Sequence, residues 1–325
     1  MVNVALVGLG NIGLLFDTDK TNLAKCLSHT KAIYANKNFN LKYAVDIDRK
    51  NFEILNDFFP NCLTYTNYEE IVNQNDIDLL VIATPTKTHY TILNAFSKNE
   101  NIKYFFIEKP LFELVQNYTS IDTTLKEKII INYSRRFSKT ISNMKKFITS
   151  KEIQPEKIII HYCKGLKNNG SHMIDLINYL FENPSIEESQ ILSKSNGLNE
   201  TDINYDIFAK LNYKGNTIPT YFIAHDHTKY NFIEVEIFSN DYLIKLNNAK
   251  SEIQYYEKID HPEFPTYKIF NPTCKTETID GTLFLSNAYA KIYTMLIDNE
   301  KNISSFDDEL QNQQFYNTII KEANK

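Results

Sequence analysis

The chain has 325 residues, 42% of them hydrophobic, and a formal net charge of −5. This length suggests about two domains with well-buried cores, and the acidic balance excludes the basic excess typical of nucleic-acid-binding proteins. The four cysteines form no C-x-x-C pair, so we expect reduced thiols and neither a disulfide framework nor a metal site. Because the chain shows no apolar leader and no run of about 18 apolar residues, we expect a cytoplasmic protein without a membrane segment.

The first half of the chain alternates between strand-like and helix-like patterns. Short apolar runs typical of buried strands are separated by amphipathic or polar stretches, which is the pattern of parallel βαβ units. We expect strands at residues 4–7, 41–45, 79–83 and 104–107. The alternation predicts an α/β fold with a doubly wound parallel sheet.

From about residue 129 the pattern changes to β-rich runs separated by short turns, which is typical of an antiparallel sheet. We expect strands at residues 129–133, 157–163, 207–213, 219–224, 233–238, 242–246 and 252–256. One helix is expected over residues 171–181, and helical patterns return at 282–297 and 306–323. The change in pattern predicts two domains, one over residues 1–127 and one over residues 128–325.

Three of the chain's eight glycines form a G-x-G-x-x-G motif directly after the first predicted strand. Gly8 permits the turn out of the strand, Gly10 lets the backbone approach a pyrophosphate, and Gly13 lets the following helix pack closely. The free N–H groups at the start of that helix then face the phosphates, together with Asn11 and Ile12. The motif predicts dinucleotide binding, and the alternative is a turn without a ligand.

An acidic residue, Asp46, ends the second predicted strand. Such a residue accepts hydrogen bonds from both hydroxyls of the adenosine ribose and repels a 2′-phosphate, so it predicts NAD rather than NADP. Two alternatives stay open. In the first, Asp46 only caps the next helix. In the second, Arg49 or Lys50 attracts the 2′-phosphate of NADP.

The distance from Gly13 to Asp46 exceeds the roughly 20 residues usual for this unit. The longer distance indicates an insertion over residues 15–28. Because this insertion follows the glycine motif, the fold topology places it near the cofactor. Residues 17–25 form either a flap over the pyrophosphate or substrate or an extended surface loop.

Four motifs in this order carry a family resemblance. They are the glycine motif, Ala83-Thr84-Pro85-Thr86 with His89, Glu108-Lys109-Pro110, and Gly170-Ser171-His172-Met173-Ile174-Asp175. Together they resemble the glucose-fructose oxidoreductase/inositol dehydrogenase/MocA family. The resemblance implies a Rossmann domain followed by a substrate-binding and oligomerisation domain, whose large, mostly antiparallel open sheet builds a homodimer or homotetramer. It also implies hydride transfer between a nicotinamide and a secondary alcohol, commonly on a sugar or nucleotide sugar.

Residues after the fourth and fifth predicted strands are expected to complete the cofactor site, because ligands of open α/β sheets bind at the carboxyl ends of strands. These residues are Thr84, Pro85, Thr86, His89, Glu108 and Lys109. His89 either contacts the cofactor or begins a helix and bonds the backbone. The bond between Lys109 and Pro110 is a candidate for the cis form.

The resemblance implies that Lys109 and His172 carry the catalysis, and the alternative for Lys109 is a solvated surface residue at a strand end. A lysine with an ordinary pKa near 10.4 needs a depression of about three units, roughly 4 kcal/mol, to act as a base near neutral pH, whereas a histidine near 6.5 needs almost none. We therefore expect His172 to take the hydroxyl proton and a charged Lys109 to stabilise the substrate oxygen. A neutral Lys109 base remains an alternative, because oxidised nicotinamide is cationic.

Two residues near His172 are expected to bind substrate or orient the imidazole. Asn168 stands where many members of the resembled family carry an aspartate, and its amide can hydrogen-bond but cannot act as a base. Asp175 is one helical turn after His172 and either orients it or lies on the helix surface.

A basic segment follows the predicted domain boundary. We expect Tyr133, Arg135 and Arg136 to bind substrate, because paired arginines suit bidentate recognition of phosphate or carboxylate. The alternative is an interdomain salt bridge. Lys164 and Lys167 add positive charge before His172 and favour a nucleoside-diphosphate sugar.

His225 and His227 have the spacing of a metal pair on one strand face, but no further ligand cluster accompanies them, so we predict no metal. The sequence thus predicts an NAD-dependent oxidoreductase acting on a sugar or nucleotide sugar. Two alternatives are a redox-cycling enzyme that retains NAD, as in glycoside cleavage, and a non-catalytic NAD- or sugar-binding regulator.

Overall fold

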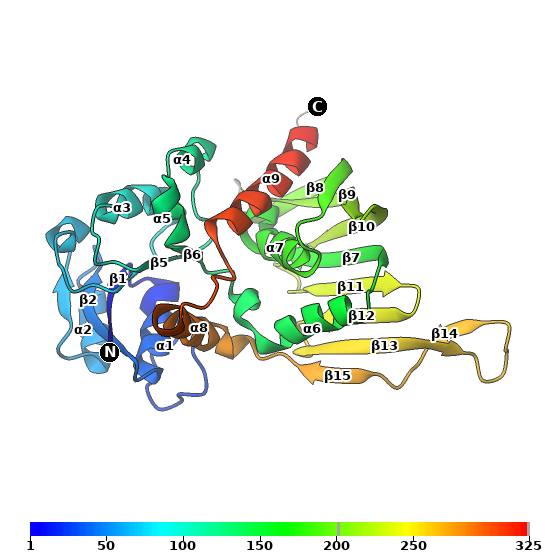
Figure 1. Ribbon diagram of the computed structural model, residues 1–325, viewed down its shortest axis with the longest axis horizontal. Helices are drawn as coiled ribbons and strands as arrows, with labels where there is room; N and C mark the ends of the chain where they lie inside the picture. Colours follow the sequence, from blue (N-terminus) through cyan, green and yellow to red (C-terminus); the bar gives the residue numbers. More distant parts are fainter. Residues whose placement is uncertain (200–201, 324–325) are drawn as a thin grey trace. The chain divides into compact units, whose positions relative to one another are not determined.

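The computed structural model describes residues 1–199 and 202–323 and shows two compact units (Figure 1). The first unit contains residues 1–138 and 281–310, and the second contains residues 139–280 and 311–325. The return of residues 281–310 to the first unit was not visible in the sequence pattern. The division into functional domains at residues 127 and 128 stays a prediction.

The first unit is built on a parallel sheet, as predicted. Its described residues form six strands in the order β3-β2-β1-β4-β5-β6, which is the order of a doubly wound dinucleotide-binding sheet. The strands are β1 Val2–Val7, β2 Phe39–Val45, β3 Leu63–Tyr65, β4 Leu79–Ile82, β5 Tyr104–Ile107 and β6 Ile129–Ile131. The central strands are buried on both faces, which explains their continuous apolar runs.

One strand was assigned to the wrong sheet. Residues 129–133 were expected to open the antiparallel region, but β6 pairs in parallel with β5 and completes the first sheet. The run Ile129–Ile131 is fully apolar and buried on both faces, which is typical of a parallel strand rather than of an alternating antiparallel one.

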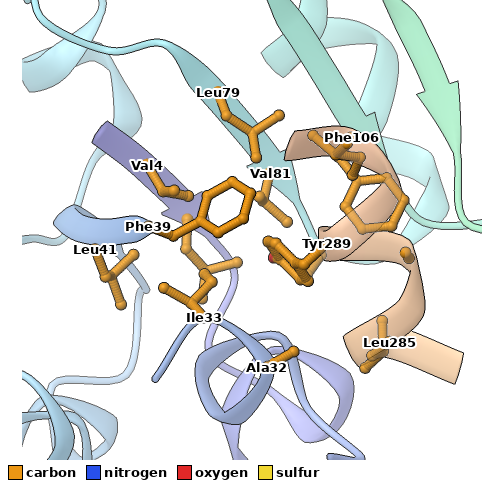
Figure 2. Packing of buried hydrophobic residues seen from close by; sticks show 14 of the residues in the cluster. Val4, Ala32, Ile33, Phe39, Leu41, Leu79, Val81, Phe106, Leu285 and Tyr289 are labelled. Carbon is orange, nitrogen blue, oxygen red and sulfur yellow. The ribbon is translucent and has the colours of Figure 1, made fainter. Parts of the chain in front are cut away.

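Helices cover both faces of this sheet. They are α1 His29–Ala35, α2 Lys50–Phe58, α3 His89–Phe96, α4 Val115–Thr119, α5 Thr123–Glu127, α8 Phe284–Asp298 and the beginning of α9 Phe306–Ala323. Figure 2 shows α8 packed on the sheet, where Tyr289 is fully buried against Phe39 and Phe106 at ring distances of 5.3 and 5.7 Å. Burying such a side chain contributes about 2 kcal/mol, so α8 is an integral part of this core.

The predicted insertion after the glycine motif lies mostly at the surface. A five-residue π-helical turn, Asn11–Leu15, precedes it, and α1 begins only at His29. The Lys20 ammonium donates to the Asp57 carbonyl at 2.6 Å and lies 5.9 Å from the Phe58 ring centroid. These residues form the last turn of α2, which runs antiparallel to the strands and ends away from their carboxyl ends. The contacts favour the surface-loop interpretation over a flap.

The second unit contains a large sheet whose strands are mostly antiparallel, as predicted. Its described part has nine strands in the order β14-β13-β12-β11-β7-β10-β9-β8, with β15 paired to β13. The strands are β7 Pro155–Cys163, β8 Ser185–Asn199, β9 Asp202–Tyr213, β10 Asn216–His225, β11 Glu234–Ser239, β12 Tyr242–Asn247, β13 Glu252–Asp260, β14 Lys268–Phe270 and β15 Lys275–Thr278. The pair β7 and β10 is parallel.

Helices cover one face of the second sheet. Figure 1 shows α6 Lys139–Ser150 and α7 Ser171–Leu180 in front of it, with the later part of α9. Ile158, Ile160 and Tyr162 of β7 are buried on the covered face, while Ile159 and His161 on the opposite face are half-buried. This alternation is the period-2 pattern from which the strands were predicted.

Candidate functional site

The predicted cofactor residues follow strands that end at one edge of the first sheet. The last residues of β1 and β4, Val7 and Ile82, lie side by side, and Ile82 is paired with Ile107 of β5. The chain order reverses between β1 and β4, and this reversal is where open α/β sheets bind their ligands. The structure therefore brings the glycine turn, residues 83–86 and residues 108–109 to the same edge.

The three motif glycines have different steric surroundings. A Cβ at Gly8, whose φ is +100°, would lie 2.7 Å from the Ala83 carbonyl, and one at Gly13 would lie 2.1 Å from the Gly8 oxygen. A Cβ at Gly10 meets nothing within 4 Å. Gly8 and Gly13 are thus required by packing, whereas Gly10 leaves space through which a diphosphate can reach the backbone. The regular helix expected after Gly13 is instead the short π-helical turn.

Asp46 braces the glycine turn from the end of β2. Its Oδ2 accepts from the Leu9 N–H at 2.5 Å and its Oδ1 accepts from the Asp48 N–H at 2.8 Å. The helix α2 begins at Lys50 and has no side-chain cap, so Asp46 does not cap it. Each carboxylate oxygen keeps a second lone pair for a ribose hydroxyl. These residues fit the adenosine ribose of a bound dinucleotide.

His89 joins the turns after β4 and β5. It is fully buried, with Nε2 2.8 Å from the Thr84 carbonyl oxygen and Nδ1 3.1 Å from the Leu111 carbonyl oxygen. The Thr88 hydroxyl lies 2.8 Å from both the Pro85 carbonyl oxygen and the Thr84 hydroxyl. The geometry supports the backbone-bonding interpretation of His89 over direct contact with the cofactor.

Glu108 is held by a buried polar cluster. Its Oε1 accepts from Asn132 Nδ2 at 2.6 Å and is 3.0 Å from His29 Nε2, and its side chain is 13% exposed. Burial raises the pKa of this carboxyl, but the His29 contact, with Asn132 and Lys109, outweighs burial and holds the pKa of Glu108 below its usual range. The carboxylate form therefore anchors the residue directly before Lys109.

Tyr289 extends this cluster from α8. Its hydroxyl lies 2.9 Å from His29 Nδ1, so His29 bridges Tyr289 and Glu108. Burial, with the nearby Glu108 carboxylate, raises the pKa of Tyr289, so the phenol stays neutral.

The Lys109 turn, residues 108–111, is also anchored after its proline. The bond between Lys109 and Pro110 is cis, as predicted. The Leu111 N–H donates to Glu309 Oε1 at 3.2 Å, and the Tyr118 hydroxyl donates to the same oxygen at 2.9 Å. Glu309 is fully buried in the first turn of α9. Together with His29, His89 and Asn132, it fixes the turn that carries the predicted catalytic lysine.

Two of the predicted substrate residues are packed inside the first unit. Tyr133 is 1% exposed and donates to Glu309 Oε2 at 2.7 Å. Arg136 is 4% exposed, pairs with Asp308 at 2.8 Å and donates to the Ile303 carbonyl at 3.0 Å. These contacts favour the salt-bridge alternative for Arg136, within one unit rather than between domains. Arg135 is half-buried.

Asn168 and His172 lie on consecutive helical segments of the second unit. Asn168 is in the π-helical turn Gly165–Gly170, and His172 is the second residue of α7. Asp175 is 1% exposed and accepts from Asn312 Nδ2 of α9 at 2.8 Å. The helix-surface alternative for Asp175 is therefore wrong, because the carboxylate is buried between α7 and α9.

His225, which the sequence spacing paired with His227, contacts another histidine in the structure. His225 Nε2 lies 2.9 Å from His161 Nδ1 of the neighbouring strand, and the two rings stack at 5.2 Å. Within residues 1–199 and 202–323, no group of three or more His, Cys, Asp or Glu side chains has a metal-binding arrangement. The same residues include no helix of the length and hydropathy needed to span a bilayer.

Sequence reasoning missed the side chains that hold the Lys109 turn. His29, Asn132 and Glu309 come from α1, the end of β6 and α9. No motif spacing connects them with Lys109, since they approach it only through the tertiary fold. One indication of these anchors was present in the sequence. Glu108 carries a carboxylate directly after a buried strand, and a buried carboxylate needs a hydrogen-bonding partner.

The sheet order, the glycine turn and the braced Asp46 define a dinucleotide-binding α/β protein. Residues 2–133 match the family model described as "Oxidoreductase family, NAD-binding Rossmann fold". This match, over the N-terminal part of the chain, confirms there the resemblance to the Gfo/Idh/MocA oxidoreductase family that was inferred from the motifs.

Solved structures share the whole fold at low sequence identity. A putative myo-inositol dehydrogenase from Sinorhizobium meliloti has a TM-score of 0.74 at 17% identity, covering 99% of this chain and 97% of its own. The UDP-N-acetylglucosamine 3-dehydrogenase GnnA from Acidithiobacillus ferrooxidans has a TM-score of 0.73 at 11% identity, with the same coverage. A super-repressor mutant of Gal80p from Saccharomyces cerevisiae has a TM-score of 0.74 at 15% identity, covering 99% of this chain and 96% of its own.

A curated relative matches part of the chain. Glycosyl hydrolase family 109 protein 1 from Shewanella sp. (strain MR-4) is 26% identical over 177 residues. The match covers 50% of this chain and 35% of the relative, so it spans only about a third of that protein's length.

Proposed function

We propose that the protein is an NAD-dependent oxidoreductase that transfers a hydride between the nicotinamide and a secondary alcohol or ketone carbon of a sugar or nucleotide sugar. The observation that carries the proposal is the glycine turn, where Gly10 faces open space beside Asp46 while Gly8 and Gly13 are closely packed. An acidic side chain at this position disfavours a 2′-phosphate, which supports NAD over NADP.

The chemistry requires two protein groups in addition to the bound nicotinamide, which would exchange the hydride. In oxidation, His172 takes the proton of the substrate hydroxyl as general base. The Lys109 ammonium donates a hydrogen bond to the same oxygen and stabilises the negative charge that develops there. In reduction, the two groups act in the reverse sense, with His172 returning the proton.

The proposed substrate class rests on the activities named for structural neighbours and on local positive charge. Those neighbours include an inositol dehydrogenase and a UDP-N-acetylglucosamine 3-dehydrogenase. Arg135, Lys164 and Lys167 add positive charge that suits a phosphate-bearing substrate, whereas Arg136 pairs with Asp308. Asn168 supplies a neutral donor and acceptor near His172. A homodimer or homotetramer and a cytoplasmic location belong to the same proposal.

The partial match to a glycosyl hydrolase supports a second candidate. In this candidate the protein keeps NAD bound, oxidises a glycoside, and reduces the product again after cleavage. The same residues serve it, but no net NADH leaves the protein.

The first test is mass spectrometry of the small molecules released when gently purified protein is denatured. NAD(H), especially with a nucleotide sugar, is the expected result, and NADP(H) would contradict the role given to Asp46. Assays with candidate sugars then separate the two functions. Net NADH formation identifies a dehydrogenase, whereas glycoside cleavage without NADH release identifies the redox-cycling enzyme. Retained NAD with neither activity would instead favour a non-catalytic regulator.

A further inference from the structure

We propose that Asp202 is a positioning residue that fixes the His172 turn, defined as residues 165–172, and favours the protonated form of His172. The inference rests on the proposed acid/base role of His172. Asp202 begins β9, about thirty residues after His172 in the chain, and no sequence motif marks it. It acts through the backbone of the turn rather than through contact with substrate.

The carboxylate of Asp202 binds two consecutive backbone donors. Oδ1 accepts from the Lys167 N–H at 2.8 Å, and Oδ2 accepts from the Asn168 N–H at 2.8 Å. Asp202 is 8% exposed, so these hydrogen bonds are shielded from water. Charge-assisted bonds of this kind are about twice as strong as neutral ones. They fix the backbone of the residue that lies one helical turn before His172.

Two glycines make room for Asp202, one for its carboxylate and one for its backbone. A Cβ at Gly165, whose φ is +87°, would lie 2.2 Å from Asp202 Cγ, and a Cβ at Gly197 would lie 1.8 Å from the Asp202 carbonyl oxygen. A side chain at Gly165 would displace the Asp202 carboxylate, and one at Gly197 would displace the Asp202 backbone. Two of the chain's eight glycines therefore serve the close approach of β8, β9 and the turn.

Asn204 adds a neutral anchor from the same strand. Its Oδ1 accepts from the Gly165 N–H at 2.8 Å, and its amide donates to the Asn196 carbonyl at 2.9 Å. It is fully buried. Asn204 thus holds the start of the turn, and Asp202 holds the following residues and supplies the charge.

The negative charge gives Asp202 an effect that a neutral anchor does not have. A nearby carboxylate favours the charged form of an imidazole, and the effect is strongest where water is excluded. Asn168 lies four residues before His172, and helical side chains tilt toward the helix N-terminus, so the His172 side chain tilts toward the turn whose N–H groups bind the carboxylate. Asn168 itself provides no charge. Asp202 therefore supplies the negative charge for this turn.

The test compares three variants of the full-length protein. Asp202→Asn removes the charge with little change in shape. Asn204→Ser weakens the neutral anchor and keeps the charge. Asp206→Asn is the matched control, because Asp206 also lies on β9 and accepts a backbone N–H, that of Ala224 at 2.7 Å, away from the turn.

The primary readout is the titration of His172 by NMR of histidine-labelled protein. The signal is assigned by its loss in His172→Gln. We expect Asp202→Asn to lower the pKa of His172, and Asn204→Ser and Asp206→Asn to leave it near the wild-type value. The amides of Lys167 and Asn168 exchange faster with solvent in Asp202→Asn than in Asp206→Asn.

Kinetics provide a second readout where turnover is established. We expect Asp202→Asn to lower kcat about tenfold with little change in KM, because the substrate groups remain while the base is misplaced. An unchanged His172 titration in folded Asp202→Asn, matching that of Asp206→Asn, would overturn the inference. Absence of hydride transfer in the wild-type protein would instead contradict the proposed function, while the titration would still decide the role of Asp202.

Discussion

The Lys109 turn and the His172 turn are anchored in different ways. Four side chains from four separate segments, His29, His89, Asn132 and Glu309, hold residues 108–111. The His172 turn is held chiefly from one strand, β9, by Asp202 and Asn204. The first turn is therefore over-determined, so losing one anchor should affect stability more than geometry. The two described anchors of the second turn come from one strand, so losing one should affect geometry and chemistry directly.

The largest expected effect is on stability at the Lys109 turn. Glu309→Ala leaves the Tyr118 and Tyr133 hydroxyls and the Leu111 N–H without their buried acceptor. We expect the free energy of unfolding to fall by about 4 kcal/mol, measured by urea denaturation. Because three other anchors remain, kcat should fall by less than about tenfold.

The neighbouring Asp307→Ala is the matched control for Glu309→Ala, since Asp307 is exposed on the same helical turn. Its free energy of unfolding should stay within about 0.5 kcal/mol of wild type. Equal stability of the two variants would show that the buried carboxylate does not hold the turn.

The next effect concerns chemistry at the His172 turn. His172→Ala removes the proposed general base, and we expect kcat to fall at least about 100-fold while stability changes little. Steady-state kinetics with the substrate identified by mass spectrometry provide the measurement. His227→Ala, a histidine of the same unit outside the turn, controls for general effects. Near wild-type turnover in His172→Ala would remove the assignment.

A smaller effect tests the cofactor preference at the glycine turn. Asp46→Asn keeps hydrogen-bonding atoms near Leu9 but removes the charge that repels a 2′-phosphate. We expect the ratio of the NADP and NAD dissociation constants to shift by about tenfold toward NADP. Binding titrations with both nucleotides measure the ratio. An unchanged ratio would leave Arg49 and Lys50 as the residues that set the preference.

The smallest effect is the acid dependence of the Lys109 turn. Because the pKa of Glu108 is lower in the folded protein than in the unfolded chain, its stabilising contribution is present above the unfolded pKa and is lost as pH falls through the folded value. Thermal denaturation below about pH 5 should show a shallower loss of stability in Glu108→Gln than in wild type. Exposed Glu113→Gln serves as control, and it should retain the wild-type pH profile.

Much of this framework follows from local sequence pattern. The glycine motif, Asp46 and most strands were predicted because strand and helix periodicity are visible over a few residues. The strand β8 was missed because its alternation is largely polar and exposed, as in Glu187, Glu188 and Lys194. Periodicity also did not show that β6 pairs with β5, because a short apolar run fits either kind of sheet.

The anchors of the candidate site could not be predicted in the same way. Glu309 and Lys109 are two hundred residues apart, and a glutamate in a polar helix gives no sign that it is buried. Arg136 was assigned to substrate because of its residue type, whereas Asp308 decides its position. Residue type and spacing indicate possible chemistry, but the partner of a buried polar group is set by the fold.

The packing of α8 has a consequence for biosynthesis. Ribosomes extend a chain from its N-terminus, and domains usually fold once their last residue has emerged. Here the sheet of the first unit is covered by Leu285, Tyr289 and Ile292, which are translated after the entire strand-rich region of the second unit. Its apolar face therefore stays uncovered on the ribosome for on the order of ten seconds, a period in which a chaperone can bind it.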